Sequence, residues 1–288
     1  MRKFARGLMA IAEYLIDIAR DWKRIAAQAP TPEWRRRDLW RTHVSLCMLP
    51  SGDGPGEASV MSYRVSFLDR KNLAHLFREI FIAGVYDVPL PSSAQRIIDC
   101  GSNIGMSILY FKTRYPGARI LGFEPHPTVF AALERNVRTN GLTDVRIRQA
   151  ALSDKPGTVE FFLHEGGEGA LNMGMFGFPG EAKSLTVEAE TLSSHLEEET
   201  DLLKLDIEGA ETSVLEDLAS HGLLRRIRRI VCEYHHHLSA ADDSLSRILS
   251  ILEQAGFGYQ VAAHQARPFR EAVYQDVVIY AYRKDVPP

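Results

Sequence analysis

Residues 97–105 read Ile-Ile-Asp-Cys-Gly-Ser-Asn-Ile-Gly, and this stretch decides the fold. Its β-branched residues predict a buried strand that ends near Asp99, and the two glycines predict a turn directly after it. Glycine lets the backbone turn sharply and approach a ligand closely. A helix is expected to follow Gly105, with its free N–H groups pointing into the crevice beyond the strand. The stretch therefore predicts the first strand, ligand-binding turn and helix of a parallel α/β sheet.

The alternation of strands and helices continues to the end of the chain. It predicts an α/β fold with a seven-stranded, mostly parallel sheet that ends in an antiparallel hairpin. An additional strand is expected at 157–163, and the helices at 106–115, 128–140, 210–221 and 242–255. The seven sheet strands are expected at 96–100, 119–124, 144–150, 202–206, 229–233, 257–263 and 275–282.

The first 90 residues differ from this pattern and predict an N-terminal α+β cap, 1–90, before a ligand-binding domain, 91–288. Residues 4–27 repeat apolar side chains every three or four positions beside a basic face, which predicts an amphipathic helix. We expect this helix to pack on the main domain or to join two copies of the chain as a homodimer. A membrane surface or a carrier protein is the alternative partner. The strands of the cap are expected at 43–48 and 59–67, and its second helix at 72–81.

Composition narrows the class of protein. The chain has 288 residues, with 34 Lys and Arg against 37 Asp and Glu, so its net charge of −3 does not predict a nucleic-acid partner. Its three widely spaced cysteines argue against a disulfide framework and favour a reducing, cytoplasmic location. No run reaches the roughly 18 apolar residues of a spanning helix, so no transmembrane segment is expected.

Polar residues follow the next two predicted strands as well. Glu124 and Pro125 stand at the end of the second strand, and an acid about 20 residues past a glycine turn is placed to bind ribose hydroxyls. Ser153 and Asp154 follow the third strand and are expected to hold an adenine amino group, with a plain turn as the alternative. Together with the glycine turn, these positions predict a nucleoside ligand.

The glycine turn favours S-adenosylmethionine (SAM) over a dinucleotide. A nicotinamide enzyme would carry G-x-G-x-x-G, but Asn103 and Met106 replace the second and third glycines of that pattern. SAM presents a sulfonium and an ammonium group instead of a pyrophosphate, so an acidic, glycine-lined pocket suits it. The predicted cofactor-binding residues are Asp99, Gly101, Ser102, Asn103, Gly105, Glu124, Pro125, Ser153, Asp154 and Asp206.

Several motifs resemble the FkbM family of SAM-dependent methyltransferases. They are IIDCGSNIGMSILYF, GFEPHP, AALSDKPGTVEF, LTVEAETLSSHL and above all LLKLDIEGAE at 202–211, and the similarity extends over about 63–282. The resemblance implies a Rossmann-like class I methyltransferase fold. It also implies O-methylation of a hydroxyl on a sugar or secondary metabolite, so the expected partner is a small-molecule acceptor, with a peptide as the alternative.

The strongest of these motifs also carries the candidate catalytic residues. Strand alternation places Lys204 and Asp206 on one face, with Glu208 just beyond the strand end. Glu233 and His235 follow the neighbouring fifth strand and are expected to face Asp206 across the pocket. The alternative role for Lys204 is a structural salt bridge with one of the acids. The alternative for the fifth strand end is that Glu233 caps or pairs locally while the histidine side chains lie in solvent.

Two arrangements of these groups are open. In the favoured one, His235 or Asp206 removes the proton of the acceptor hydroxyl without a metal ion. In the other, Asp206, Glu233 and His235 hold a divalent cation that lowers the pKa of the hydroxyl. Residues 164–180 and 264–274 are predicted to be loops that contact the acceptor.

Three other functions compete with O-methylation. N- or carboxyl-methylation of a peptide or small amine is the alternative reaction, and the lack of a Pro-Pro-Tyr/Phe motif after the fourth strand counts against DNA or amine substrates. A subunit that binds SAM without catalysis would have been free to lose its acids. A dehydrogenase is disfavoured by the glycine turn.

Overall fold

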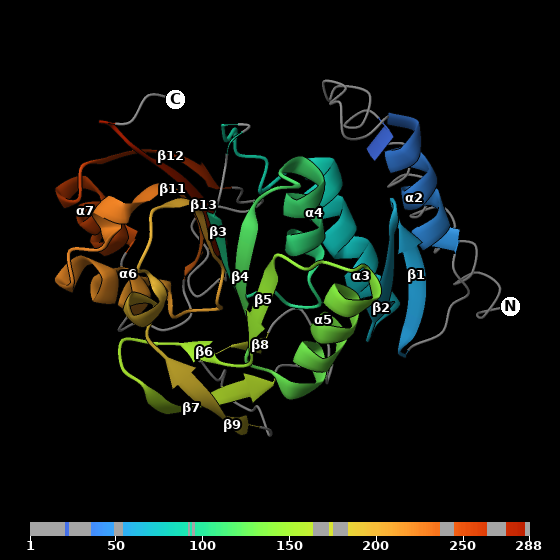
Figure 1. The fold of residues 1–288 in the computed structure, drawn as a ribbon, viewed down its shortest axis with the longest axis horizontal. Coiled ribbons are helices and arrows are strands. Elements are labelled where there is room, and N and C mark those ends of the chain that lie inside the picture. The colour runs from blue at the N-terminus through green and yellow to red at the C-terminus, as the bar shows by residue number, and fades with distance from the viewer. Residues whose placement is uncertain are drawn as a thin grey trace, which may run out of the picture. The chain divides into compact units, whose positions relative to one another are not determined.

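The computed structural model describes residues 21–22, 36–48, 54–91, 93, 96–163, 173–174, 184–236, 245–263 and 275–285. The chain forms two compact units, Met1–Asp87 and Val88–Pro288. Figure 1 labels their helices and strands.

The second unit is built on a seven-stranded sheet with the order β12-β13-β11-β10-β3-β4-β5. Neighbours from β11 to β5 pair in parallel, whereas β13 runs antiparallel to both β11 and β12. The predicted mostly parallel sheet with a C-terminal hairpin is confirmed. The last strand, β13, lies between β11 and β12, so β12 forms the edge of the sheet. The strands are β3 (Arg96–Cys100), β4 (Arg119–Phe123), β5 (Val145–Arg148), β10 (Thr200–Leu205), β11 (Ile227–His236), β12 (Phe257–Ala263) and β13 (Gln275–Arg283).

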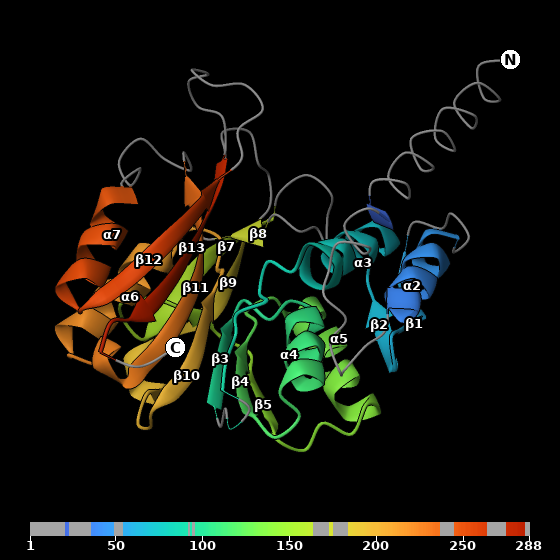
Figure 2. The same cartoon turned by 90° about the horizontal axis from the view of Figure 1, so that it is seen from above.

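Helices cover both faces of this sheet (Figures 1 and 2). The helices α4 (Met106–Arg114) and α5 (Pro127–Thr139) lie on one face, and α6 (Glu211–Ser220) and α7 (Leu245–Gln254) on the other. All six residues of β10 are buried, as expected for a central parallel strand covered on both sides.

Side-chain alternation along the central strands separates the core from the site. Ile98 and Cys100 of β3 and Leu203 and Leu205 of β10 belong to the hydrophobic core that includes α6 and α7. Alternate residues point to the opposite face. The intervening Asp99 and Lys204 therefore point to the side of the sheet that α4 covers.

A second, four-stranded sheet has the order β6-β9-β7-β8. The predicted strand at 157–163 is confirmed as β7, but the other three strands of this sheet were not predicted. Of the loop expected at 164–180, only β8 lies within the described residues, and the loop expected at 264–274 lies wholly outside them. The strands are β6 (Ala151–Leu152), β7 (Gly157–Leu163), β8 (Met173–Gly174) and β9 (Ser184–Glu190).

The first unit corrects two predictions. Residues 43–48 are not a strand but the end of a helix, α2, because Leu39, His43 and Leu46 recur at helical spacing and are all buried. Residues 59–67 are not one strand but parts of two, joined at Met61, whose φ is 53°. The elements are α2 (Arg36–Met48), β1 (Gly56–Val60), β2 (Tyr63–Phe67), α3 (Arg70–Phe77) and the π-helix η1 (Arg78–Ala83).

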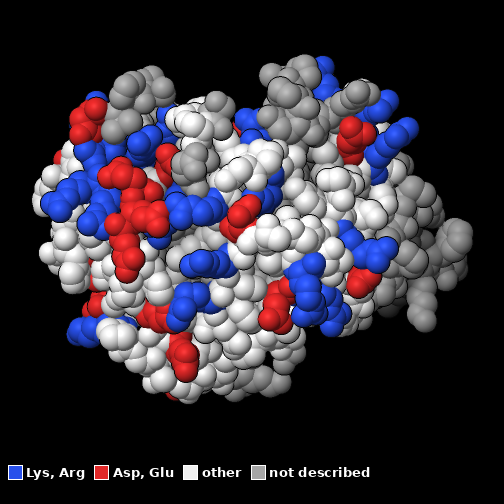
Figure 3. All heavy atoms as spheres, viewed as in Figure 1, with Lys and Arg blue, Asp and Glu red and all other residues white. Residues whose placement is uncertain are grey.

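The helix expected at 4–27 lies outside the described residues except for 21–22. None of the described helices combines the length and apolar character that crossing a bilayer requires. On the face shown in Figure 3, acidic and basic side chains are interspersed. Exposed pairs such as Arg119 with Glu198 join opposite charges on the surface.

Candidate active site

The glycine turn after β3 is held between the ends of two neighbouring strands. The Gly101 N–H donates to the carbonyl oxygen of Phe123 (3.0 Å), and the Asp206 N–H donates to the carbonyl oxygen of Cys100 (3.2 Å). Gly101 has a φ of 81°, and a Cβ there would lie 1.8 Å from the carbonyl oxygen of Asp206. Only glycine fits such a position. The turn therefore brings the predicted cofactor loop against the segment that carries Asp206.

Asp99 lies beneath this turn with no exposed surface. Ser107 of α4 donates a 2.6 Å hydrogen bond to Oδ2 of Asp99. Within the described residues, Oδ1 of Asp99 accepts no hydrogen bond and lies 3.4 Å from Nζ of Lys204. A buried carboxylate needs such compensation. The pair fixes Asp99 at the carboxyl end of β3.

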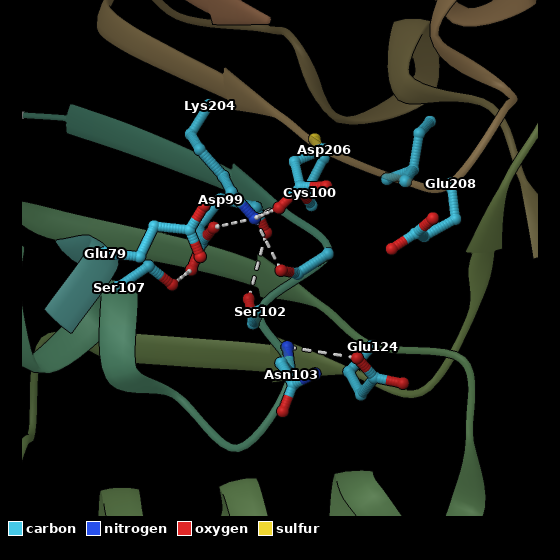
Figure 4. Close-up of polar contacts among 12 residues, drawn as sticks. Glu79, Asp99, Cys100, Ser102, Asn103, Ser107, Glu124, Lys204, Asp206 and Glu208 are labelled. Carbon is cyan, nitrogen blue, oxygen red and sulfur yellow. Dashed lines mark hydrogen bonds and ion pairs between the residues drawn. The ribbon is translucent and has the colours of Figure 1, made fainter. Parts of the chain in front are cut away.

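Lys204 reaches from β10 toward the turn, as Figure 4 shows. Its Nζ donates to the carbonyl oxygens of Cys100 (3.1 Å) and Gly101 (2.6 Å) and lies 3.2 Å from Oδ2 of Asp206. Burial lowers the pKa of Lys204, but the carboxylates of Asp206 and Asp99 outweigh burial and raise it above its ordinary value. The ammonium group therefore stays charged and links both strand ends to the glycine turn.

Glu124 follows β4 and points toward the same turn. Its carboxylate oxygens accept hydrogen bonds from the N–H groups of Asn103 (3.0 Å) and His126 (2.8 Å). Burial raises its pKa from 4.5 to about 7, and the two hydrogen bonds limit that rise. Ser102 and Gly105 lie within the same turn, and Pro125 precedes α5.

A second cluster lies where β10 and β11 end. His235 is 4% exposed, and its Nδ1 lies 2.9 Å from Oε1 of Glu211. Its Nε2 lies 3.7 Å from Oδ1 of Asp206 and 3.4 Å from Oε2 of Glu208. Burial lowers the pKa of His235, but the charges of Glu211 and Glu208 dominate and raise it well above the ordinary value. Figure 4 shows Asp206 and Glu208 on the same segment, beyond the end of β10.

The structure places the remaining predicted residues outside these two groups. Glu233 is partly buried on β11, but among the residues that the structure describes, the three that could jointly hold a metal ion are Asp206, Glu208 and His235. Ser153 and Asp154 follow β6 instead of β5, and the Ser153 hydroxyl donates to Oδ1 of Asp154 (3.2 Å).

Sequence reasoning missed two supporting residues. Ser107 stands in the first turn of the helix that follows the glycine turn, where a hydroxyl can reach back to Asp99. Glu211 is the first residue of α6 and contacts His235 across 24 positions of sequence. The sequence shows Glu211 in the LLKLDIEGAE motif, but it does not show that Glu211 contacts His235.

The residues at the turn fit a cationic cofactor. Asp99 and Asp206 flank the Lys204 ammonium group, and Glu124 contacts the same turn, so three carboxyl groups lie at the turn beside this lysine. Two of these acids stand at the carboxyl ends of adjacent parallel strands, where α/β sheets bind their ligands. The seven-stranded, mostly parallel sheet with its inserted antiparallel strand is the Rossmann-like fold of class I methyltransferases.

The chain belongs to the FkbM methyltransferase family, because residues 99–259 match the family model described as "Methyltransferase FkbM domain". The resemblance found in the sequence is thereby confirmed. The match lies within the second compact unit and includes the glycine turn, β10 and β11.

Named relatives agree with the family. The chain is 33% identical over 165 residues to Methyltransferase 1 of Beauveria bassiana (strain ARSEF 2860), which covers 50% of this chain and 66% of that protein. It is 32% identical over 193 residues to Methyltransferase sdnD of Sordaria araneosa, covering 56% and 73%. It is 28% identical over 258 residues to the 31-O-demethyl-FK506 methyltransferase FkbM of Streptomyces tacrolimicus, covering 77% and 91%.

Among solved structures, the chain is similar to Methyltransferase FkbM from Methylobacillus flagellatus KT. The TM-score is 0.44 and the identity 16%, with 74% of this chain and 54% of that chain covered.

Proposed function

We propose that this methyltransferase transfers the methyl group of SAM to a hydroxyl of a small molecule, such as a sugar or secondary metabolite. One observation carries the proposal. The acidic glycine turn that would hold the methyl donor adjoins a second cluster of carboxylates and imidazole, and Asp206 belongs to both. The donor methyl and the acceptor hydroxyl would therefore meet beside Asp206.

The reaction makes modest demands on the protein. The hydroxyl oxygen attacks the methyl carbon in line, the carbon–sulfur bond breaks, and its electron pair returns to sulfur to give S-adenosylhomocysteine. The hydroxyl proton must leave as the oxygen–carbon bond forms. The protein accelerates this reaction mainly by aligning the two reactants, and a proton acceptor accelerates it further.

The groups at the turn suit the donor. Ionised Glu124 would accept hydrogen bonds from the ribose hydroxyls. The turn backbone, supported from beneath by Asp99, would face the methionine part. The residues proposed to bind SAM are Asp99, Gly101, Ser102, Asn103, Gly105, Glu124, Pro125 and Asp206, and Ser153 and Asp154 remain proposed for the adenine.

The proton acceptor is proposed to be a carboxylate beyond β10. His235 is buried with Nδ1 held by Glu211, so its ring would position these carboxylates and the acceptor. Asp206 and Glu208 are each about one-fifth exposed and can meet an acceptor. Glu233 stays a weaker proposal, because it lies outside this group.

Support for a hydroxyl acceptor comes from one relative. The protein of Streptomyces tacrolimicus is named as a 31-O-demethyl-FK506 methyltransferase, a name that states O-methylation of a small molecule. We propose the same reaction type for this chain, without the same substrate.

Two measurements test the proposal. Calorimetry should show SAM binding and no NAD binding, and the absence of heat with SAM would refute the donor assignment. A panel of sugar and natural-product alcohols, incubated with methyl-labelled SAM, should give a labelled ether. Label on amines or carboxylates alone would refute the hydroxyl assignment. Asp206→Asn should lose far more turnover than SAM affinity, whereas Glu198→Gln at an exposed surface pair should change neither.

A further inference from the structure

Three side chains at the ends of β10 and β11 form a group that could bind a metal ion. Ligand atoms of Asp206, Glu208 and His235 all lie within 4.8 Å of one another. We propose that this group binds one divalent cation, and that the cation binds the acceptor hydroxyl. The role in catalysis rests on the proposed function, but cation binding is tested without methyl transfer. The set differs from the one expected from sequence, because Glu208 takes the place of Glu233.

The distances within the group fit ligands of one shared cation. Nε2 of His235 lies 3.4 Å from Glu208 Oε2 and 3.7 Å from Asp206 Oδ1. Two ligand atoms at about 2.1 Å from one metal ion lie roughly 3.0 to 4.2 Å apart. Both separations fall in that range.

The imidazole is also oriented as a metal ligand would be. Nδ1 of His235 lies 2.9 Å from the carboxylate of Glu211, which has no exposed surface. That carboxylate is itself fixed, because it accepts hydrogen bonds from the N–H groups of Ile207 (3.1 Å) and Gly209 (3.1 Å). Metal-binding histidines ordinarily donate their second N–H to such a group, which turns the other nitrogen toward the ion.

The surroundings leave room for a substrate ligand. Asp206 and Glu208 are 22% and 23% exposed, whereas His235 is buried, so the cation would be held from the protein side and open toward the acceptor. The three protein ligands would leave other coordination positions for the hydroxyl and water. Two carboxylates and one imidazole suit Mn²⁺ well, so Mn²⁺ is the probe.

The cation changes how the proton leaves. A hydroxyl bound to it would have a lowered pKa, which would ease the transfer of the hydroxyl proton to a carboxylate beyond β10. The oxygen would attack the methyl carbon as that proton leaves, and sulfur would take the electron pair of the broken carbon–sulfur bond. Asp206, Glu208 and His235 would hold the cation and so place the oxygen in line with the methyl group.

A titration with the metal alone tests the site. The full-length chain, without a histidine tag and after chelator treatment, is titrated with MnCl₂ while the paramagnetic resonance signal of free Mn²⁺ is recorded. We expect saturable binding of one Mn²⁺ per chain. Glu208→Gln should weaken binding by at least about tenfold, since it removes a charged ligand. The matched variant Glu198→Gln, at an exposed carboxylate paired with Arg119, should bind like the unmodified chain.

Each outcome bears on the proposal. Lack of saturable Mn²⁺ binding by the unmodified chain would overturn it, whatever the variants do. Equal weakening in Glu208→Gln and Glu198→Gln would also overturn it, because binding would then follow net charge. Calorimetry with SAM on the same preparations separates the two proposals. SAM binding without Mn²⁺ binding defeats only the cation site, and Mn²⁺ binding without SAM binding defeats the proposed function.

Discussion

At the scale of single residues, Glu124 should couple SAM binding to pH. Its pKa of about 7 means that a large share of the carboxyl is protonated below neutrality. In the proposed SAM site the ribose hydroxyls would donate to the ionised form, so the dissociation constant of SAM should fall as pH rises toward 7. The fall is limited to about tenfold per pH unit and should level off above the pKa. Calorimetry across this range measures it, and Glu124→Gln should abolish the dependence.

Ionisation of Glu124 has the opposite effect on folding stability: a rise in pH that favours SAM binding lowers the free energy of unfolding. Its folded-state pKa lies above its ordinary value of 4.5, so the folded state binds the proton more tightly than the unfolded state does. This contribution is fully present below about pH 4.5 and is lost as pH rises through about 7, by roughly 3 kcal/mol at most. A pH profile of SAM affinity that persists in Glu124→Gln would show that another group is responsible.

Lys204 should matter for stability more than its single charge suggests. Lys204→Met would leave Asp99 buried without its cation and remove the donor to two carbonyl oxygens. Removing one partner of a buried ion pair costs about 3 to 5 kcal/mol in the free energy of unfolding. Urea denaturation measures the loss. The double variant Lys204→Met with Asp99→Asn should recover part of it, and no recovery would contradict the pairing.

At the scale of elements, the turn between β3 and α4 should not tolerate a side chain. Gly101→Ala would place a methyl group 1.8 Å from the carbonyl oxygen of Asp206, at a φ of 81°. The variant should lose more than about 1 kcal/mol of stability, and its SAM affinity should fall at least about tenfold as the turn shifts. Gly117→Ala is the matched control, because a methyl group there meets no atom within 4 Å. Equal melting temperatures for the two variants would contradict the packing described for the turn.

The central elements could be predicted because their signals are local. Buried parallel strands such as β10 read as continuous apolar runs, and the glycine turn identifies the strand before it. The small sheet could not be predicted in the same way. Its strands β6 and β8 have two residues each, so they depend on pairing with other segments. The alternating exposed and buried positions of β9 are a strand signal that the sequence prediction overlooked. Residues 43–48 were mistaken for a strand because a short apolar run fits either structure.

The residues of the candidate site also differ in whether their positions could be predicted from local sequence. Asp99, Glu124 and Asp206 follow their strands in sequence, so their common edge could be predicted. The contacts of Glu211 with His235 and of Ser107 with Asp99 join a helix to a strand end. Such contacts depend on how the helices pack, which the sequence does not state locally. For the same reason the sequence did not predict that Glu208, and not Glu233, joins His235 and Asp206 in one group.

At the scale of the whole molecule, the inserted strand β13 governs when the site can be completed during synthesis. β11, which carries His235, has β10 on one side, and its other side is paired only by β13, the last strand of the sheet. His235 itself pairs with Asp276. A nascent chain that has not yet emerged from the ribosome past this segment exposes an unpaired edge of β11, which other chains can join. Premature termination before residue 275 would thus leave the glycine turn formed beside an aggregation-prone strand.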